Sequence, residues 1–348
     1  MTPYLSDKIK ILSFISIILV LYLHANFPDE VMESNILPVY VRKATIGIIG
    51  PCAVPLFFFI SGFLFFLKLR NGVLDVFVKQ KRRIKTLLIP FVIAAIVFPL
   101  FFIVMESIPG IQDYLKIDSI IHKLEMLSMK DIVCSLFYDS GDGSPWAYHL
   151  WFLRDLIIIV AISPLLFFIR KSLHYWCPFV FFILSFVFPT IGIVRSIYWF
   201  LLGSTIIHII DRMSYGLVKI IIILFLMLSI TNIVFPHTLL HYCAIFYVTL
   251  GVISLWKIYD MIVPNGFKLS ENRLMSFSCQ FTFFIYLFHL PLYNFVVRGI
   301  PIVLGQNAFG YLVSYLFSPI IFTPFIIVVG WLLRCYMPMF YNILVGGR

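Results

Sequence analysis

Charged side chains are scarce in this chain. Only 12% of its 348 residues are Asp, Glu, Lys or Arg, whereas a soluble globular domain has about 25% charged residues. This composition excludes a disordered chain and a nucleic-acid-binding module, because both need many polar or basic residues. We therefore expect no nucleic-acid partner.

Cysteine pairs are also lacking. The six cysteines are scattered and form no CxxC motif, so neither a zinc site nor a thioredoxin-type site is indicated. His237 and His241 are four residues apart, but no carboxylate lies near them in the sequence. We expect no metal.

Hydrophobic residues make up 61% of the chain. Apolar runs of roughly 20 residues recur, and each is long enough to cross a hydrocarbon core of about 30 Å as a helix. The predicted fold class is all-α, a polytopic transmembrane bundle of about ten helices. The runs lie near 8–26, 44–67, 86–105, 148–169, 175–191, 193–210, 217–235, 239–257, 274–298 and 310–334.

We expect one membrane domain over residues 1–348, with no appended soluble domain. A long polar connection at about 106–147 is predicted to lie outside the membrane, with an amphipathic helix near 117–129. Lys and Arg accumulate in cytoplasmic loops, and most of the 26 basic residues fall on one side of this topology. The bias predicts that both termini lie in the cytoplasm.

Ionisable groups at membrane depth are costly and therefore candidates for function. His24 lies about 24 Å above Lys8 at the helical rise, near the outer end of the first run. His289 reaches the same level above Arg273, and His149 opens the fourth run from that side. We interpret the three histidines as one outer cluster, although His24 also suits a packing or headgroup-facing role.

Arg154 joins this level and is followed directly by Asp155. Adjacent helical residues do not face each other, so we expect each of the two to have its own partner inside the bundle.

A basic cluster precedes the third run: Lys79-Gln80-Lys81-Arg82-Arg83-Ile84-Lys85. Cytoplasmic topology and attraction to anionic membrane lipids explain such a cluster. A phosphate-rich cytosolic cofactor would need the same residues, because Arg binds phosphate through a bidentate fork. Elsewhere, the small pair Ser61-Gly62 predicts close helix packing rather than a nucleophile.

Five stretches resemble membrane-bound acyltransferase family 3, the bacterial integral-membrane carbohydrate O-acyltransferases. They occur in family order: Val20-Leu21-Tyr22-Leu23-His24-Ala25, Val54-Pro55-Leu56-Phe57-Phe58-Phe59-Ile60-Ser61-Gly62-Phe63-Leu64, Lys81-Arg82-Arg83-Ile84-Lys85-Thr86-Leu87-Leu88-Ile89-Pro90, His149-Leu150-Trp151-Phe152-Leu153-Arg154 and Ile285-Tyr286-Leu287-Phe288-His289.

The resemblance implies transfer of an acyl group, usually acetyl, from cytosolic acetyl-CoA to a hydroxyl of a cell-envelope carbohydrate at the bacterial inner membrane. It implies that His24 is the essential residue. Members of the family place an arginine where this chain has Ser13, a departure for which Lys10 is a candidate replacement.

On this basis Arg82, Arg83 and Lys85, with Lys10, are the candidate CoA-binding residues. His24 is the candidate general base, because an imidazole titrates near neutral pH. Arg154 or His149 is the candidate for stabilising the oxyanion, and His289 the candidate for orienting a partner.

Two other functions compete with this one. A transporter or flippase of a glycan precursor would use the same histidines and Arg154 as a substrate or proton path. No inverted repeat or matched pair of broken helices supports it. A structural subunit of an envelope assembly is the third alternative. Oligomeric state is open.

Overall fold

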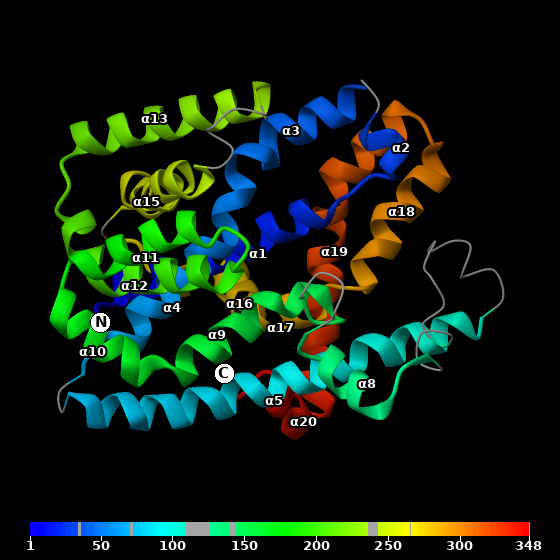
Figure 1. The fold of residues 1–348 in the computed structure, drawn as a ribbon. Helices are drawn as coiled ribbons and strands as arrows, with labels where there is room; N and C mark the ends of the chain where they lie inside the picture. The colour runs from blue at the N-terminus through cyan, green and yellow to red at the C-terminus, as the bar shows by residue number, and fades with distance from the viewer. Residues whose placement is uncertain are drawn as a thin grey trace. The chain divides into compact units, whose positions relative to one another are not determined.

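The computed structural model describes residues 1–33, 36–69, 72–108, 121, 126–138, 144–235, 243–264 and 266–347. Throughout these residues the regular structure is helical and no strand is present, which confirms the all-α prediction (Figure 1). The chain divides into two compact units, and each unit is built from two separate stretches of sequence. The prediction of a single domain stays a prediction.

Unit 1 contains residues 1–79 and 162–282. Its elements are α1 (Pro3–His24), α2 (Asp29–Met32), α3 (Leu37–Ile49), η1 (Gly50–Cys52), α4 (Ala53–Phe66), α10 (Ser163–Leu173), α11 (Trp176–Val187), α12 (Gly192–Asp211), α13 (Tyr215–Val234), α15 (Ala244–Ile262), η3 (Leu269–Glu271) and α16 (Arg273–Cys279).

Unit 2 contains residues 80–161 and 283–348. Its elements are most of α5 (Val73–Glu106), then α8 (Met129–Ser135), η2 (Tyr148–Leu150), α9 (Trp151–Ala161), most of α17 (Thr282–Phe288), α18 (Leu292–Leu304), α19 (Ala308–Tyr336) and α20 (Pro338–Leu344).

Helix α1 carries His24 at its last position. The side chain of Thr2 accepts a hydrogen bond from the Leu5 amide, and Pro3 occupies the first turn, where its missing N–H costs nothing. After His24 the chain leaves the helix through Ala25 and reaches Pro28, which cannot continue it. Local sequence therefore places this histidine at a helix end.

Helices α4 and α12 pack closely in unit 1. A Cβ on Gly62 of α4 would overlap the backbone carbonyl of Phe200, and one on Gly203 of α12 would overlap that of Phe59. The two glycines thus allow the helix backbones to touch, as small residues do between membrane helices. The packing predicted for Ser61-Gly62 is confirmed.

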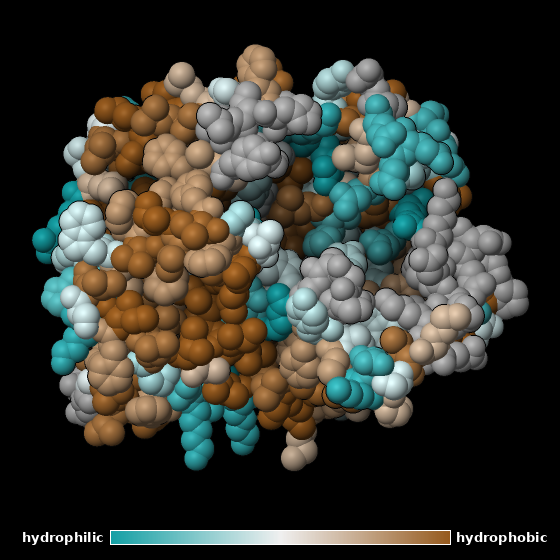
Figure 2. Space-filling model, viewed as in Figure 1, coloured by the Kyte–Doolittle hydropathy of each residue, from teal (hydrophilic) through white to brown (hydrophobic). Residues whose placement is uncertain are grey.

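Among the described residues, six helices are long and apolar enough to span a membrane, or up to eight if two bent pairs each count as one span. The exposed surface is correspondingly apolar over much of one face (Figure 2). The two remaining predicted runs correspond to α1, which carries Asp7, Lys8 and Lys10, and to α11, which has only 12 residues. The count of ten and the orientation stay predictions.

Two predicted spans are not continuous. The run near 148–169 breaks between α9 and α10, and the second break lies near Pro291. The run near 274–298 forms α16, α17 and the start of α18, and α17 and α18 meet at an angle of 73°. Pro291 lies at this break, where it lacks an amide donor and disfavours helix at the residue before it. The prediction of a single helix there is wrong.

Part of the predicted outer connection lies outside the described residues, including most of the predicted amphipathic helix near 117–129. Within the described part of that connection, α8 begins after Ser128, whose side chain accepts from the Asp131 amide.

Candidate functional site

His24 lies at the C-terminal end of α1, half-buried, and Arg42 of α3 holds this end in place. The Arg42 guanidinium donates to the carbonyl of Leu23 at 3.1 Å, to that of Ala25 at 3.3 Å and to Oδ1 of Asn26 at 2.6 Å. The last carbonyls of a helix have no partner within it and carry partial negative charge, so a cation suits them.

Arg42 is also close enough to His24 for the two side chains to interact electrostatically. A permanent positive charge therefore lies beside the candidate base. Sequence reasoning missed Arg42 because nothing in its spacing connects it to His24.

The other end of α1 carries a buried cation, Lys8, which is only 2% exposed. Its Nζ lies 2.8 Å from both carboxylate oxygens of Asp260 on α15 and 4.0 Å from the ring centre of Trp256. Lys257 completes the cluster, 3.4 Å from Asp260. Two cations thus flank one carboxylate, and an aromatic face covers one of these cations, Lys8.

Lys10, the predicted replacement for the first-helix arginine, is not buried as Lys8 is. It is exposed and pairs with Asp7 at 3.4 Å along the same helix. The buried cation of α1 is therefore Lys8, which lies closer to the N-terminus of the helix than Lys10 does.

In unit 2, His149 and His289 are in contact. Their ring centroids are 5.1 Å apart in an edge-to-face arrangement, and both residues are buried. Nε2 of His149 lies 3.2 Å from the Leu287 carbonyl, and Nδ1 of His289 lies 2.9 Å from the Tyr286 carbonyl. Two segments far apart in sequence therefore meet through these rings.

The carbonyl partners assign the tautomers of both rings. A carbonyl oxygen only accepts, so His149 carries its proton on Nε2 and His289 carries its proton on Nδ1. In its neutral form each ring then keeps a lone pair on the opposite nitrogen, Nδ1 of His149 and Nε2 of His289. Each has one basic nitrogen.

Tyr286 fixes the start of α9 against α17. Its hydroxyl accepts from the Leu153 amide at 3.2 Å and donates to the His149 carbonyl at 3.1 Å. Tyr286 belongs to the fifth family-like stretch, Ile285-Tyr286-Leu287-Phe288-His289, which by itself indicates no role for it. The structure shows that it satisfies two backbone groups near a helix start, where amide groups lack partners within the helix.

Arg154 and Asp155 pair with each other, so the expectation that these adjacent residues do not interact is wrong. Nε and Nη2 of Arg154 lie 3.1 and 3.0 Å from the same oxygen of Asp155. The long arginine side chain folds back along the helix, which Cβ directions alone do not anticipate. Nη1 also donates to the Phe137 carbonyl at 3.3 Å.

The basic cluster on α5 divides into two groups. Lys79 donates to the carbonyls of Phe65 and Leu67 and so caps the C-terminal end of α4. Arg82 and Lys85 are exposed and Arg83 is half-buried. No hydrogen bond or ion pair joins the side chains of these three to any residue that the structure describes.

Figure 2 shows hydrophilic side chains projecting along the edge where α5 runs in Figure 1. Because their side chains have no partner among the described residues, Arg82, Arg83 and Lys85 are available to an anion, whereas Lys79 serves the fold.

Metal binding has no candidate in the described residues, where no group of three or more His, Cys, Asp or Glu side chains could hold an ion. The pair His237 and His241 lies outside those residues.

The arrangement therefore offers three kinds of group: a histidine at a helix end in unit 1, a tautomer-assigned histidine pair in unit 2, and three cations on α5 that pair with none of the described residues. Such groups can move a proton, orient a polar substrate and bind phosphate.

A comparison with protein families matches an acyltransferase domain, acyltransferase family 3, over residues 7–335. No curated protein and no solved structure matches the chain. The match covers nearly the whole chain and includes all the site residues described above. The chain therefore belongs to acyltransferase family 3 and is a multi-pass membrane acyltransferase.

Proposed function

We propose that this acyltransferase moves an acetyl group from cytosolic acetyl-CoA to a hydroxyl of a cell-envelope carbohydrate at the bacterial inner membrane. The observation that carries the proposal is the set of three cations on α5, Arg82, Arg83 and Lys85, which have no partner among the described residues. In an acyltransferase, such a set suits the phosphates of CoA.

The chemistry of the phosphates favours this assignment. Arg forms parallel hydrogen bonds with a phosphate, and two arginines with a lysine match a ligand that carries several phosphates. Lys10, exposed on α1, is the further cation that we assign to the donor. Anionic lipid headgroups offer the same chemistry, so the test below separates the two.

In the proposed reaction His24 takes the proton of the acceptor hydroxyl while the hydroxyl oxygen attacks the thioester carbonyl. The carbon–sulfur bond then breaks, the acetyl group stays on the sugar oxygen, and the CoA thiolate leaves and gains a proton. Arg42 supports His24 by fixing the helix end.

Arg154 or His149 is the proposed donor to the oxyanion, and His289 positions His149. His149 would donate from Nδ1 in its doubly protonated form, because its Nε2 proton is directed at the Leu287 carbonyl. The contacts of Arg154 with Asp155 and the Phe137 carbonyl support this role, because a stabilising donor must be held in place before the charge develops.

Purified protein in phospholipid vesicles, supplied with labelled acetyl-CoA and envelope glycans, tests the reaction. Wild-type protein is expected to label the glycan, and His24→Ala to lose transfer by a factor of roughly 100 or more. Full transfer by His24→Ala would show that His24 is not the general base. Counterflow of glycan without consumption of acetyl-CoA would indicate a transporter instead.

The donor site is tested by the triple variant Arg82→Gln, Arg83→Gln, Lys85→Gln. Its KM for acetyl-CoA is expected to rise roughly tenfold or more, with a smaller change in kcat. Lys171→Gln with Lys219→Gln, two exposed cations elsewhere, is the control and should leave KM unchanged. An unchanged KM together with a new dependence on anionic lipid would assign the cluster to headgroups.

A further inference from the structure

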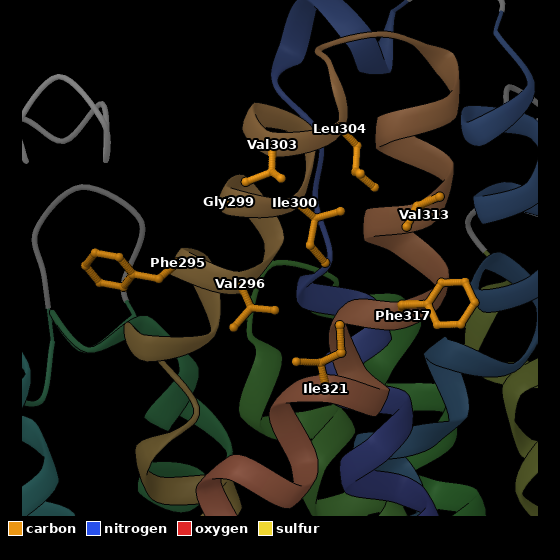
Figure 3. Close-up of a pocket in the computed structure, with 9 residues that line it drawn as sticks. All are labelled: Phe295, Val296, Gly299, Ile300, Val303, Leu304, Val313, Phe317 and Ile321. Atoms are coloured by element: carbon orange, nitrogen blue, oxygen red, sulfur yellow. The ribbon is translucent and has the colours of Figure 1, made fainter.

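An apolar groove of about 550 Å³ lies between α18 and α19 in unit 2. The described residues that line it are all apolar or glycine, among them Val296, Ile300 and Val303 of α18 and Val313, Phe317 and Ile321 of α19. In Figure 3, Ile300 extends from α18 into the space that Val313 and Ile321 border from α19.

Buried hydrogen bonds hold the two walls of the groove together. The hydroxyl groups of Tyr293 and Ser318 lie 2.8 Å apart, and Ser314 donates to the Val297 carbonyl at 2.6 Å. These residues are on the faces where the helices meet, and Tyr293, Ser314 and Ser318 are fully buried. These bonds therefore fix the two helices against each other beside the groove.

The size and lining of the groove match a hydrocarbon chain. From Phe295 to Leu304, α18 rises about 14 Å, close to half of the roughly 30 Å hydrocarbon core of a bilayer. A ligand site for a polar molecule normally includes a few polar groups that fix its orientation. The described residues that line this groove supply no polar group, so its occupant needs no polar group over that length.

The groove begins next to the histidine pair. The Tyr293 amide donates to the His289 carbonyl at 2.8 Å, and Phe295, two residues on, is the first lining residue. Phe295 also packs against Phe101 of α5, with ring centroids 6.0 Å apart. A chain lying in the groove would thus have one end close to His289 and His149, which favours a substrate over an ordinary membrane lipid.

We propose that this groove binds the hydrocarbon tail of a lipid-linked carbohydrate, which is the acyl acceptor. The inference rests on the proposed function and narrows its acceptor to a sugar that is attached to a membrane-embedded chain. The tail lies along α18 between the leaflet surface and the bilayer centre, and the sugar is held at the end near the histidine pair.

Photolabelling tests the groove without requiring transfer. The probe is a long-chain alkyl glucoside with a diazirine in its tail, added to the full-length protein in phosphatidylcholine vesicles. Labelled residues are located by mass spectrometry. Label is expected on α18 and α19 and should be displaced by unlabelled alkyl glucoside but not by added phosphatidylcholine.

Two variants fill the groove from opposite walls, Ile300→Trp and Val313→Trp. Each should reduce labelling roughly fivefold or more, because the added side chain overpacks the groove when the probe is bound. Ile302→Trp is the control, since Ile302 is an exposed residue of α18 that does not line the groove. It should retain the label.

His24→Ala separates this inference from the proposed reaction, because it should keep the label and lose transfer. Labelling that phosphatidylcholine displaces equally well would show ordinary lipid in the groove and overturn the proposal. Absence of label from α18 and α19, or labelling unaffected by both filling variants, would overturn it as well.

Discussion

The sequence singles out His24 but not Arg42, which holds the helix end that carries His24. His24 stands at the end of α1, where the backbone carbonyls lack helical partners, and the Arg42 guanidinium binds two of the carbonyls around it. A lysine could supply the charge but not the planar fork that reaches two carbonyls and Asn26 together.

Arg42→Met is expected to destabilise the protein by about 1–3 kcal/mol, because it leaves helix-end carbonyls without their charged donor. Arg42→Lys should recover part of this loss. The measurement is thermal unfolding in detergent, followed by circular dichroism, with Lys43→Met as the control at an exposed neighbouring cation. Equal unfolding temperatures for Arg42→Met and wild type would contradict the capping role.

At the residue scale, the sequence predicts which side chains share one level when their depth in the membrane alone decides it. It predicted one level for His24, His149 and His289, and the rings of the last two are in contact. The place of His24 at that level stays a prediction. Sequence reasoning failed for Arg154 and Asp155, because the path of a long flexible side chain is not fixed by helical spacing. It also gave Lys8 no role, since burial of one cation on α1 depends on Asp260 of α15.

Close packing of α4 on α12 depends on two glycines, each facing a carbonyl of the other helix. Gly62→Ala should therefore force the helices apart and lower the free energy of unfolding by roughly 1–3 kcal/mol, the usual cost of overpacking. Gly216→Ala on α13 is the matched control, because nothing lies within 4 Å of a Cβ at that position.

That control should be neutral or slightly stabilising, since alanine favours helix over glycine by about 1 kcal/mol. Unfolding by a denaturing detergent measures both variants. A Gly62→Ala protein as stable as Gly216→Ala would show that the two helices have room to separate.

The pair formed by Lys8 and Asp260 joins α1 to α15. Removing one member of a buried pair leaves a charge without its partner, so Lys8→Met should cost on the order of 3 kcal/mol, even with Lys257 still near Asp260. Lys8→Met combined with Asp260→Leu should be less destabilising than Lys8→Met alone. A double variant whose loss equals the sum of both single losses would contradict this coupling.

At the scale of the element, apolar runs predicted most helices, whereas proline decided where some of them end. The run near 274–298 is continuous in hydropathy, yet the structure bends by 73° between α17 and α18. Hydropathy reports the cost of exposing side chains to lipid and carries no information about backbone hydrogen bonds, which Pro291 interrupts.

Over the whole molecule, the chain passes between its two units repeatedly, since each unit contains an early and a late stretch of sequence. The donor cations Arg82, Arg83 and Lys85 belong to unit 2, as do His149 and His289, while His24 belongs to unit 1.

The orientation of the protein in the membrane is predicted from the distribution of Lys and Arg, and two exposed cysteines test it. Cys134 lies in the predicted outer connection and Cys335 in the last turn of α19, on the predicted cytoplasmic side. In spheroplasts, a membrane-impermeant maleimide should label a variant that retains only Cys134. A variant that retains only Cys335 should react after permeabilisation alone. The reverse pattern would invert the topology.

The sequence by itself determined that this protein is helical and membrane-embedded. Polar groups are costly in hydrocarbon, so a membrane-spanning segment must be apolar and must satisfy its backbone within a helix, and the repeated apolar runs meet this requirement. The ordered motifs of the sequence also indicated the acyltransferase family. Only the tertiary structure decided which cations are committed to the fold, namely Lys8, Lys79 and Arg42, and which remain available to an anion. It alone showed the groove between α18 and α19, because partners and cavities arise from contacts between segments distant in the chain.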